Sequence, residues 1–115
     1  MQNIIICNAF SLNMLKDLSV ARKVYVQPVS DPVAFLAEEE ERGAVVTSAV
    51  GHADTAALFA GILQREVPAV RSTVLIDNQT MLLVGQYKGP RLPEGTTVLP
   101  EGATVEWVWI TSRVM

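Results

Sequence analysis

The amino-acid sequence predicts an α/β fold in which one domain holds a mixed β-sheet with flanking helices. Three observations support this. The segment Asn3–Cys7 is continuously apolar and β-branched, which indicates a central strand covered on both faces. Residues 32–42 and 53–65 carry apolar side chains at helical spacing, and each segment begins with residues that suit a helix N-terminus. Residues 104–110 alternate apolar and polar as a half-buried strand does. A length of 115 residues suits a single domain, spanning 1–115.

Composition and charge exclude several functional classes. The net charge of −3 argues against a general grip on duplex DNA or RNA, although a few local cations could still hold a small anion. No run approaches the ~20 apolar residues of a membrane span, so no membrane partner is expected. Cys7 is the only cysteine, which favours an intracellular, cytoplasmic protein without disulfides.

The remaining elements follow from local patterns. Ser30 or Asp31 is expected to cap the helix that starts at Pro32, and the run Glu38–Glu41 near its end is interpreted as a solvated face. Ser11 is expected to cap a short helix after the first strand. Further strands are predicted over residues 22–28, 44–50, 72–76 and 81–85. The turn residues at 77–80 indicate that the last two form a β-hairpin.

The run Gly85–Gly95, G-Q-Y-K-G-P-R-L-P-E-G, is predicted to be irregular, and the chain is expected to stay so until about Val105. Its prolines restrict the backbone around Arg91 and Glu94. A stiffened loop on a scaffold is a usual place for a functional site. The alternative interpretation is a solvated proline-rich turn.

Polar residues also stand at two strand-to-helix junctions. Asn8 and Ser11 follow the first strand, and His52 precedes the helix at 53–65. Helix N-termini at the carboxyl ends of strands bind anions through free backbone N–H groups. The alternatives are that Asn8 and Ser11 only end a strand and start a helix, and that the lone histidine is structural. Trp107 and Trp109 share a face, which predicts core or subunit packing in preference to base stacking.

The motifs N-A-F-S-L-N-M-L, G-H before a helix, and G-Q-Y-x-G-P-R-L-P-E-G together resemble those of the viral ring nucleases. These are type III anti-CRISPR proteins with relatives in bacteria and archaea. The resemblance covers essentially the whole chain. It implies a symmetric homodimer that cleaves cyclic tetra-adenylate into linear di-adenylates without a metal, in the cytoplasm of the host cell if the protein is viral.

The residue types fit that chemistry. The sequence has no cluster of His, Cys, Asp and Glu at metal-ligand spacing, so neither a metal nor another cofactor is expected. Arg91 suits the phosphoryl oxygens and His52 the leaving 5′-oxygen, whereas Glu94 could orient either His52 or the attacking 2′-hydroxyl. The expected substrate-binding residues are Asn8, Ala9, Phe10, Ser11, Asn13, Gly51, Thr55, Arg71, Gln86 and Lys88. The rival interpretation is a module that binds a cyclic oligonucleotide without cutting it, as a sponge or sensor. A third is a regulatory protein whose loop is an interaction surface.

Overall fold

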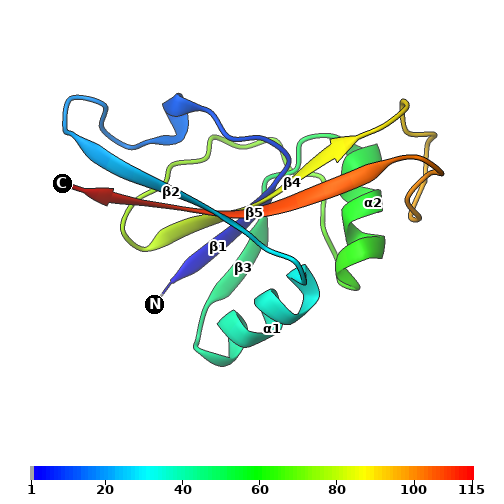
Figure 1. Ribbon diagram of the computed structural model, residues 1–115, viewed down its shortest axis with the longest axis horizontal. Coiled ribbons are helices and arrows are strands. Elements are labelled where there is room, and N and C mark those ends of the chain that lie inside the picture. The colour runs from blue at the N-terminus through cyan, green and yellow to red at the C-terminus, as the bar shows by residue number, and fades with distance from the viewer. Residues whose placement is uncertain (1) are drawn as a thin grey trace.

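The computed structural model describes residues 2–115 and has the predicted α/β fold, with one five-stranded mixed sheet and two α-helices. Met1, the first residue of the predicted domain, lies outside the described residues. The strands run in the order β2-β5-β4-β1-β3, and both helices lie on one face (Figure 1). The elements are β1 (Asn3–Cys7), a short 3-10 helix (Leu12–Met14), β2 (Arg22–Pro28), α1 (Pro32–Glu41), β3 (Val45–Ser48), α2 (Ala53–Leu63), β4 (Thr80–Lys88) and β5 (Thr104–Val114). None of the described helices is long and apolar enough to cross a membrane.

Strand direction brings several chain segments to one edge of the sheet. β1 pairs in parallel with both β3 and β4, whereas β5 pairs antiparallel with β4 and β2. The chain therefore leaves β1, β3 and β4 at the same edge, and β5 begins there. The carboxyl ends of parallel strands are where open α/β sheets usually bind ligands.

The helix-covered face carries the larger core. Ile4, Leu83 and Phe59 are buried there, and Trp107 packs its ring 4.8 Å from that of Phe59. A side chain at Gly85 would place its Cβ 2.7 Å from both rings, so only glycine lets them close over β4. Core and subunit packing were both expected for the tryptophans; within this chain Trp107 is buried in the core, and Trp109 is partly buried against the same cluster.

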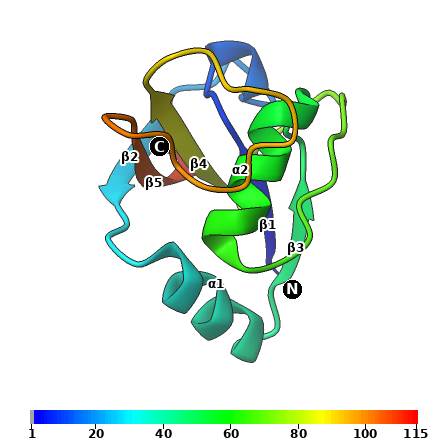
Figure 2. The same cartoon turned by 90° about the vertical axis from the view of Figure 1, so that its right-hand side faces the viewer.

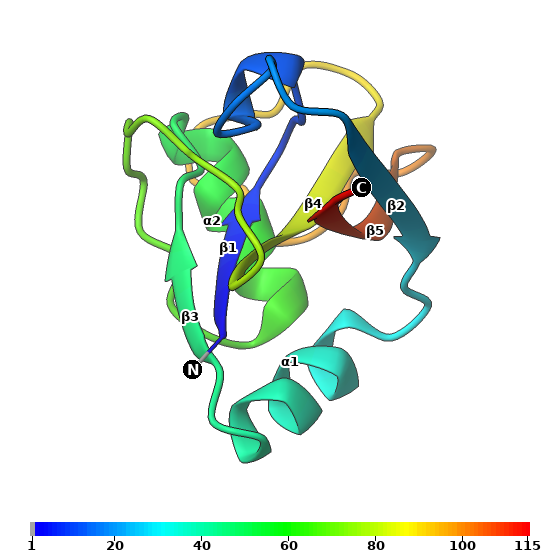
Figure 3. The ribbon, with the colours of Figure 1, turned by 90° about the vertical axis from the view of Figure 1, so that its left-hand side faces the viewer.

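Irregular chain covers the other face of the sheet. Part of it is the segment 72–76, which was predicted to form a hairpin with β4, and that prediction was wrong. The segment 72–76 does not pair with β4. Ile76 instead donates its backbone N–H to the Met14 carbonyl at 2.7 Å, and Leu15 forms a parallel bridge with Ile76. Figure 3 shows the chain between α2 and β4 as irregular. Asp77 does form the expected turn by accepting from the Gln79 N–H at 2.8 Å. The turn signal was right and the pairing wrong, because β1 and β5 occupy both sides of β4.

The start of α1 confirms the sequence prediction, and its acidic end corrects it. The Asp31 carboxylate accepts from the Ala34 N–H at 3.0 Å, so Asp31 is the cap, with Pro32 in the first turn. Glu39 is not part of a solvated face: it is only 7% exposed and pairs with Arg42 at 3.1 Å. Its helical position turns it toward the sheet, whereas the other three glutamates of the run are exposed.

Two local predictions also need correction. Ser11 stands at the predicted N-cap position, but its side chain makes no capping hydrogen bond, and the segment after it forms only a single 3-10 turn. The segment 85–88 is not irregular but belongs to β4, because Gln86 pairs with Glu106 and Lys88 with Thr104. The irregular loop therefore covers residues 89–103.

Candidate functional site

A groove of about 310 Å³ opens where β1 and β4 end. Asn8, Ala9 and Phe10 form one wall, and Gln86 and Glu106 stand on the facing strands. Four of the predicted binding residues therefore line one surface although they come from opposite halves of the chain. The apolar floor of the groove consists of Val84, Val108 and Ile110.

Strand register explains which side chains face the groove. Val84 lies opposite Val108, and Gln86 lies opposite Glu106. Alternate residues of a strand point to the same face, so Gln86 follows Val84 into the groove while Gly85 faces the helices. At the rim, the Lys88 ammonium lies 2.9 Å from the Glu106 carboxylate, with both side chains more than half exposed. This pair contributes little to stability, and Glu106 offsets much of the positive field expected from Lys88.

The turn after β1 is held by local hydrogen bonds. The Cys7 thiol donates to the Ala9 carbonyl at 3.4 Å. Burial raises the pKa of Cys7 to about 11, with the Ala9 contact opposing the shift. A neutral buried thiol supports the turn and is a poor nucleophile. Ser11 and Asn13 are exposed and hydrogen-bond to each other, which leaves them near the groove but outside its lining.

The N-terminus of α2 forms a second part of this edge. His52 is the N-cap residue, exposed, and its carbonyl accepts from the Ala56 N–H at 2.9 Å. Arg71 comes from the irregular segment after α2, and its Nε–H donates to the Gly51 carbonyl at 3.2 Å. The structure thus places Arg71 against Gly51, the residue that precedes His52, a contact that sequence spacing could not reveal. Thr55 lies in the first turn of α2 and is partly buried.

The 89–103 loop carries Arg91 and Glu94 past α2 (Figure 2). The Tyr87 hydroxyl donates to the Pro90 carbonyl at 2.6 Å, which anchors the start of the loop. Farther along, the Thr97 carbonyl lies against Gly61 of α2, where a Cβ would come within 2.0 Å of it. The loop therefore rests on the helix that His52 begins.

The side chains of Arg91 and Glu94 are exposed and form no hydrogen bond or ion pair within residues 2–115. No hydrogen bond joins Glu94 to His52 in this conformation, so both alternatives for Glu94 stay predictions. Over the same described range, no group of three or more His, Cys, Asp and Glu side chains is placed to hold a metal ion.

Comparison with known proteins gives one family and one fold. A family model described as STIV B116-like matches residues 4–103. Among solved structures, the chain is similar to B116 of Sulfolobus turreted icosahedral virus, with 22% identity and a TM-score of 0.74. That match covers 95% of this chain and 98% of the viral one. A search of curated proteins found no match. At this identity, the structural similarity shows a shared fold.

Proposed function

The chain belongs to the STIV B116-like family, and we propose that it is a metal-independent ring nuclease that cleaves cyclic tetra-adenylate into linear di-adenylates. Such cleavage would remove the second messenger of type III CRISPR defence and switch off the nucleases that it activates. One observation carries the proposal: three motifs distant in sequence, around Asn8, His52 and Gln86, are gathered at one edge of the sheet. The motif resemblance supplies the substrate.

The reaction has three requirements that these side chains can meet. The substrate's 2′-oxygen attacks the neighbouring phosphorus, the bond to the 5′-oxygen breaks, and a 2′,3′-cyclic phosphate forms. The protein must align the attack, stabilise charge on the phosphoryl oxygens and protonate the leaving oxygen. Arg91 is assigned to the phosphoryl oxygens and His52 to the proton. Glu94 orients His52 or the 2′-hydroxyl.

The size of the groove argues for two copies of the chain. Small-molecule sites span roughly 300–1,000 Å³, and the groove's 310 Å³ suits about one nucleotide. Two such grooves across a dimer axis would hold two of the four nucleotides, and a ring with two-fold symmetry presents equivalent nucleotides to the two copies. Sedimentation velocity with and without the ring measures the oligomeric state. A monomer at micromolar concentration in both conditions would contradict the dimer.

The direct test incubates the protein with radiolabelled cyclic tetra-adenylate and excess EDTA, and separates the products by chromatography. Di-adenylate with cyclic phosphate ends is expected. Arg91→Ala should slow single-turnover cleavage ~10²-fold, as loss of an oxyanion donor does. Arg91→Lys should recover only part of the lost cleavage rate, since an ammonium lacks the planar donor fork of a guanidinium. Lys16→Ala, which removes an exposed cation outside the groove, is the matched control and should cleave like wild type.

A sulfur substitution isolates the role of His52. His52→Ala should still bind the ring but cleave it ~10²–10⁴-fold more slowly, the usual contribution of a general acid. Replacing the scissile 5′-oxygen by sulfur makes protonation unnecessary, because a thiolate leaves unaided. The variant should then approach wild type on the sulfur substrate. An equal defect on both substrates would assign His52 to another role.

The second candidate function is a module that binds the ring without cutting it. It is favoured by one observation: His52 and Glu94 are both exposed and are not hydrogen-bonded to each other. The same EDTA assay separates the candidates. Retention of intact ring on the protein, with no product at stoichiometric enzyme over hours, would establish the binding module and exclude the nuclease.

A further inference from the structure

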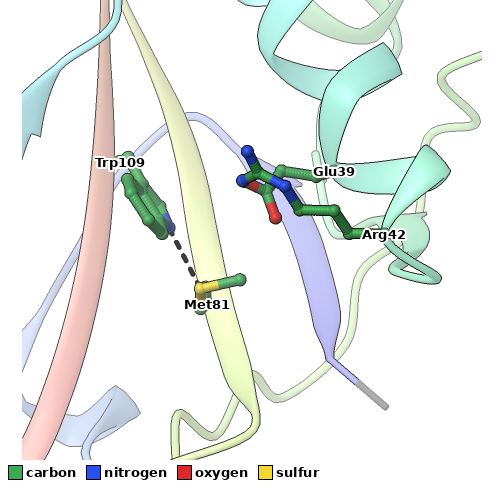
Figure 4. Close-up of polar contacts among 4 residues, drawn as sticks. All are labelled: Glu39, Arg42, Met81 and Trp109. Atoms are coloured by element: carbon green, nitrogen blue, oxygen red, sulfur yellow. Dashed lines mark hydrogen bonds and ion pairs between the residues drawn. The ribbon is translucent and has the colours of Figure 1, made fainter.

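A second and larger cavity, of about 930 Å³, lies on the helix-covered face near the amino end of β4. Its lining includes Tyr25 and Gln27 of β2, Trp109 and Arg113 of β5, and Arg42 after α1. It shares none of its lining residues with the groove at the carboxyl edge. Figure 4 shows the Arg42 side chain extending from α1 toward the strands that carry Met81 and Trp109.

Trp109, which lines this cavity, has an indole N–H that is only weakly hydrogen-bonded. Trp109 packs on Phe35 with ring centroids 5.3 Å apart and is only partly buried. Its Nε1–H donates to the Met81 sulfur at 3.2 Å, and a thioether is a weak acceptor. An oxygen or nitrogen acceptor on a ligand would satisfy this N–H better. Tyr25, 42% exposed, adds a second aromatic surface on the neighbouring strand.

Positive charge beside the cavity lacks a counter-charge: Arg113 belongs to the lining, and Lys23 stands outside the lining on the neighbouring strand. Lys23 and Arg113 are directly opposite each other in the β2–β5 register, an arrangement of like charges that is destabilising. Within residues 2–115, neither takes part in an ion pair. The two carboxylates of the lining are already engaged: Glu39 pairs with Arg42, and Asp77 accepts from the Gln79 N–H, which lowers the pKa of Asp77. An anion at Arg113 would relieve the repulsion.

We propose that this cavity is a second ligand site that takes a mononucleotide, with the base against Trp109 and Tyr25 and the phosphate at Arg113 and Lys23. Aromatic side chains stack on any base, and arginine binds phosphate through a bidentate fork. The volume lies near the top of the roughly 300–1,000 Å³ range of small-molecule sites, which is ample for a base, a sugar and a phosphate. This proposal stands independently of ring cleavage.

The test follows the two indole N–H resonances of ¹⁵N-labelled protein during titration with adenosine 5′-monophosphate. Trp109→Phe assigns the resonances. The Trp109 signal should shift with saturation, whereas Trp107, which is 8% exposed and covered by Phe59, should not move. Adenosine, which lacks the phosphate, should bind about tenfold or more weakly, as loss of a charge-assisted contact predicts. Ribose 5-phosphate, which lacks the base, should leave the Trp109 signal almost unmoved.

Variants at the two ends of the sheet show whether the nucleotide binds in this cavity or at the carboxyl edge. Arg113→Ala should weaken nucleotide binding about tenfold or more, and Arg113→Lys should recover part of it. Arg91→Ala, at the carboxyl edge, should leave the affinity measured at Trp109 unchanged. The proposal is overturned by no saturable Trp109 shift at millimolar nucleotide, or by equal affinity in Arg113→Ala. It is also overturned if the Trp109 shift depends on protein concentration alone, which would mean that a second copy covers this face.

Discussion

Gly61→Ala should separate the stability of the protein from the positioning of its 89–103 loop. A Cβ at Gly61 would lie 2.0 Å from the Thr97 carbonyl oxygen, whereas ordinary contact begins at 3.4 Å, so the loop must retreat by the difference, 1.4 Å. Arg91 and Glu94 belong to that loop. Misplacement by about 1 Å can cost ~10²-fold in rate, so we expect the proposed ring cleavage, measured in single turnover, to slow by about that factor. Alanine is a better helix former than glycine by ~1 kcal/mol, which offsets the lost contact and should keep the free energy of unfolding near wild type.

The assay pairs cleavage rates with urea unfolding on the same samples. Gly43→Ala is a control with the opposite expected pattern, a change in stability without a change in cleavage rate. Nothing lies within 4 Å of a Cβ added at Gly43, but its φ of +93° strains alanine. It should lose roughly 1–2 kcal/mol of stability and cleave at the wild-type rate, because it is remote from the loop. If the proposed ring cleavage occurs, a Gly61→Ala variant that cleaves as fast as wild type would refute the inference that contact with α2 positions the 89–103 loop for that reaction.

Three further predictions concern the fold. Gly85→Ala should destabilise the protein by roughly 1–3 kcal/mol in urea unfolding, because its Cβ would lie 2.7 Å from both core rings. Asp31→Ala should cost about 1 kcal/mol in the same measurement, because the Ala34 N–H loses its acceptor. The folded state holds the Cys7 proton more tightly, with the pKa raised from 9.0 to about 11. The resulting stability, about 2–3 kcal/mol, should be complete below pH 9 and lost as the pH rises through 11. Iodoacetamide should accordingly label the folded thiol far more slowly than the urea-unfolded one at pH 8.

Each of these has a simple contradicting result. Unchanged urea midpoints in Gly85→Ala or Asp31→Ala would mean that the core relaxes around the methyl group, or that water replaces the cap. For Cys7, the control is Cys7→Ala. This variant lacks the thiol, so the loss of stability between pH 8 and pH 10.5 that comes from Cys7 should be absent. Equal labelling rates in folded and unfolded protein would show that the thiol is not protected.

The sequence by itself determined the features that depend on neighbouring residues. An apolar, β-branched run places β1 inside the sheet, and the Asp31-Pro32 pair starts α1, because strand burial and helix capping are settled within a few residues. The turn at 77–79 was also readable from local residue types. The motifs that suggested a functional edge needed only their positions at the ends of predicted strands.

Only the tertiary structure decided which segments meet. β4 pairs with β1 and not with 72–76, because hydrogen-bond partners in a sheet are chosen by the whole fold and a turn signal cannot name them. The same holds for Arg71 at the Gly51 carbonyl and for the loop resting on Gly61, contacts that join residues 20 or more apart. Glu39 was misjudged for this reason too: its burial depends on the sheet beneath α1, which no run of four glutamates can reveal.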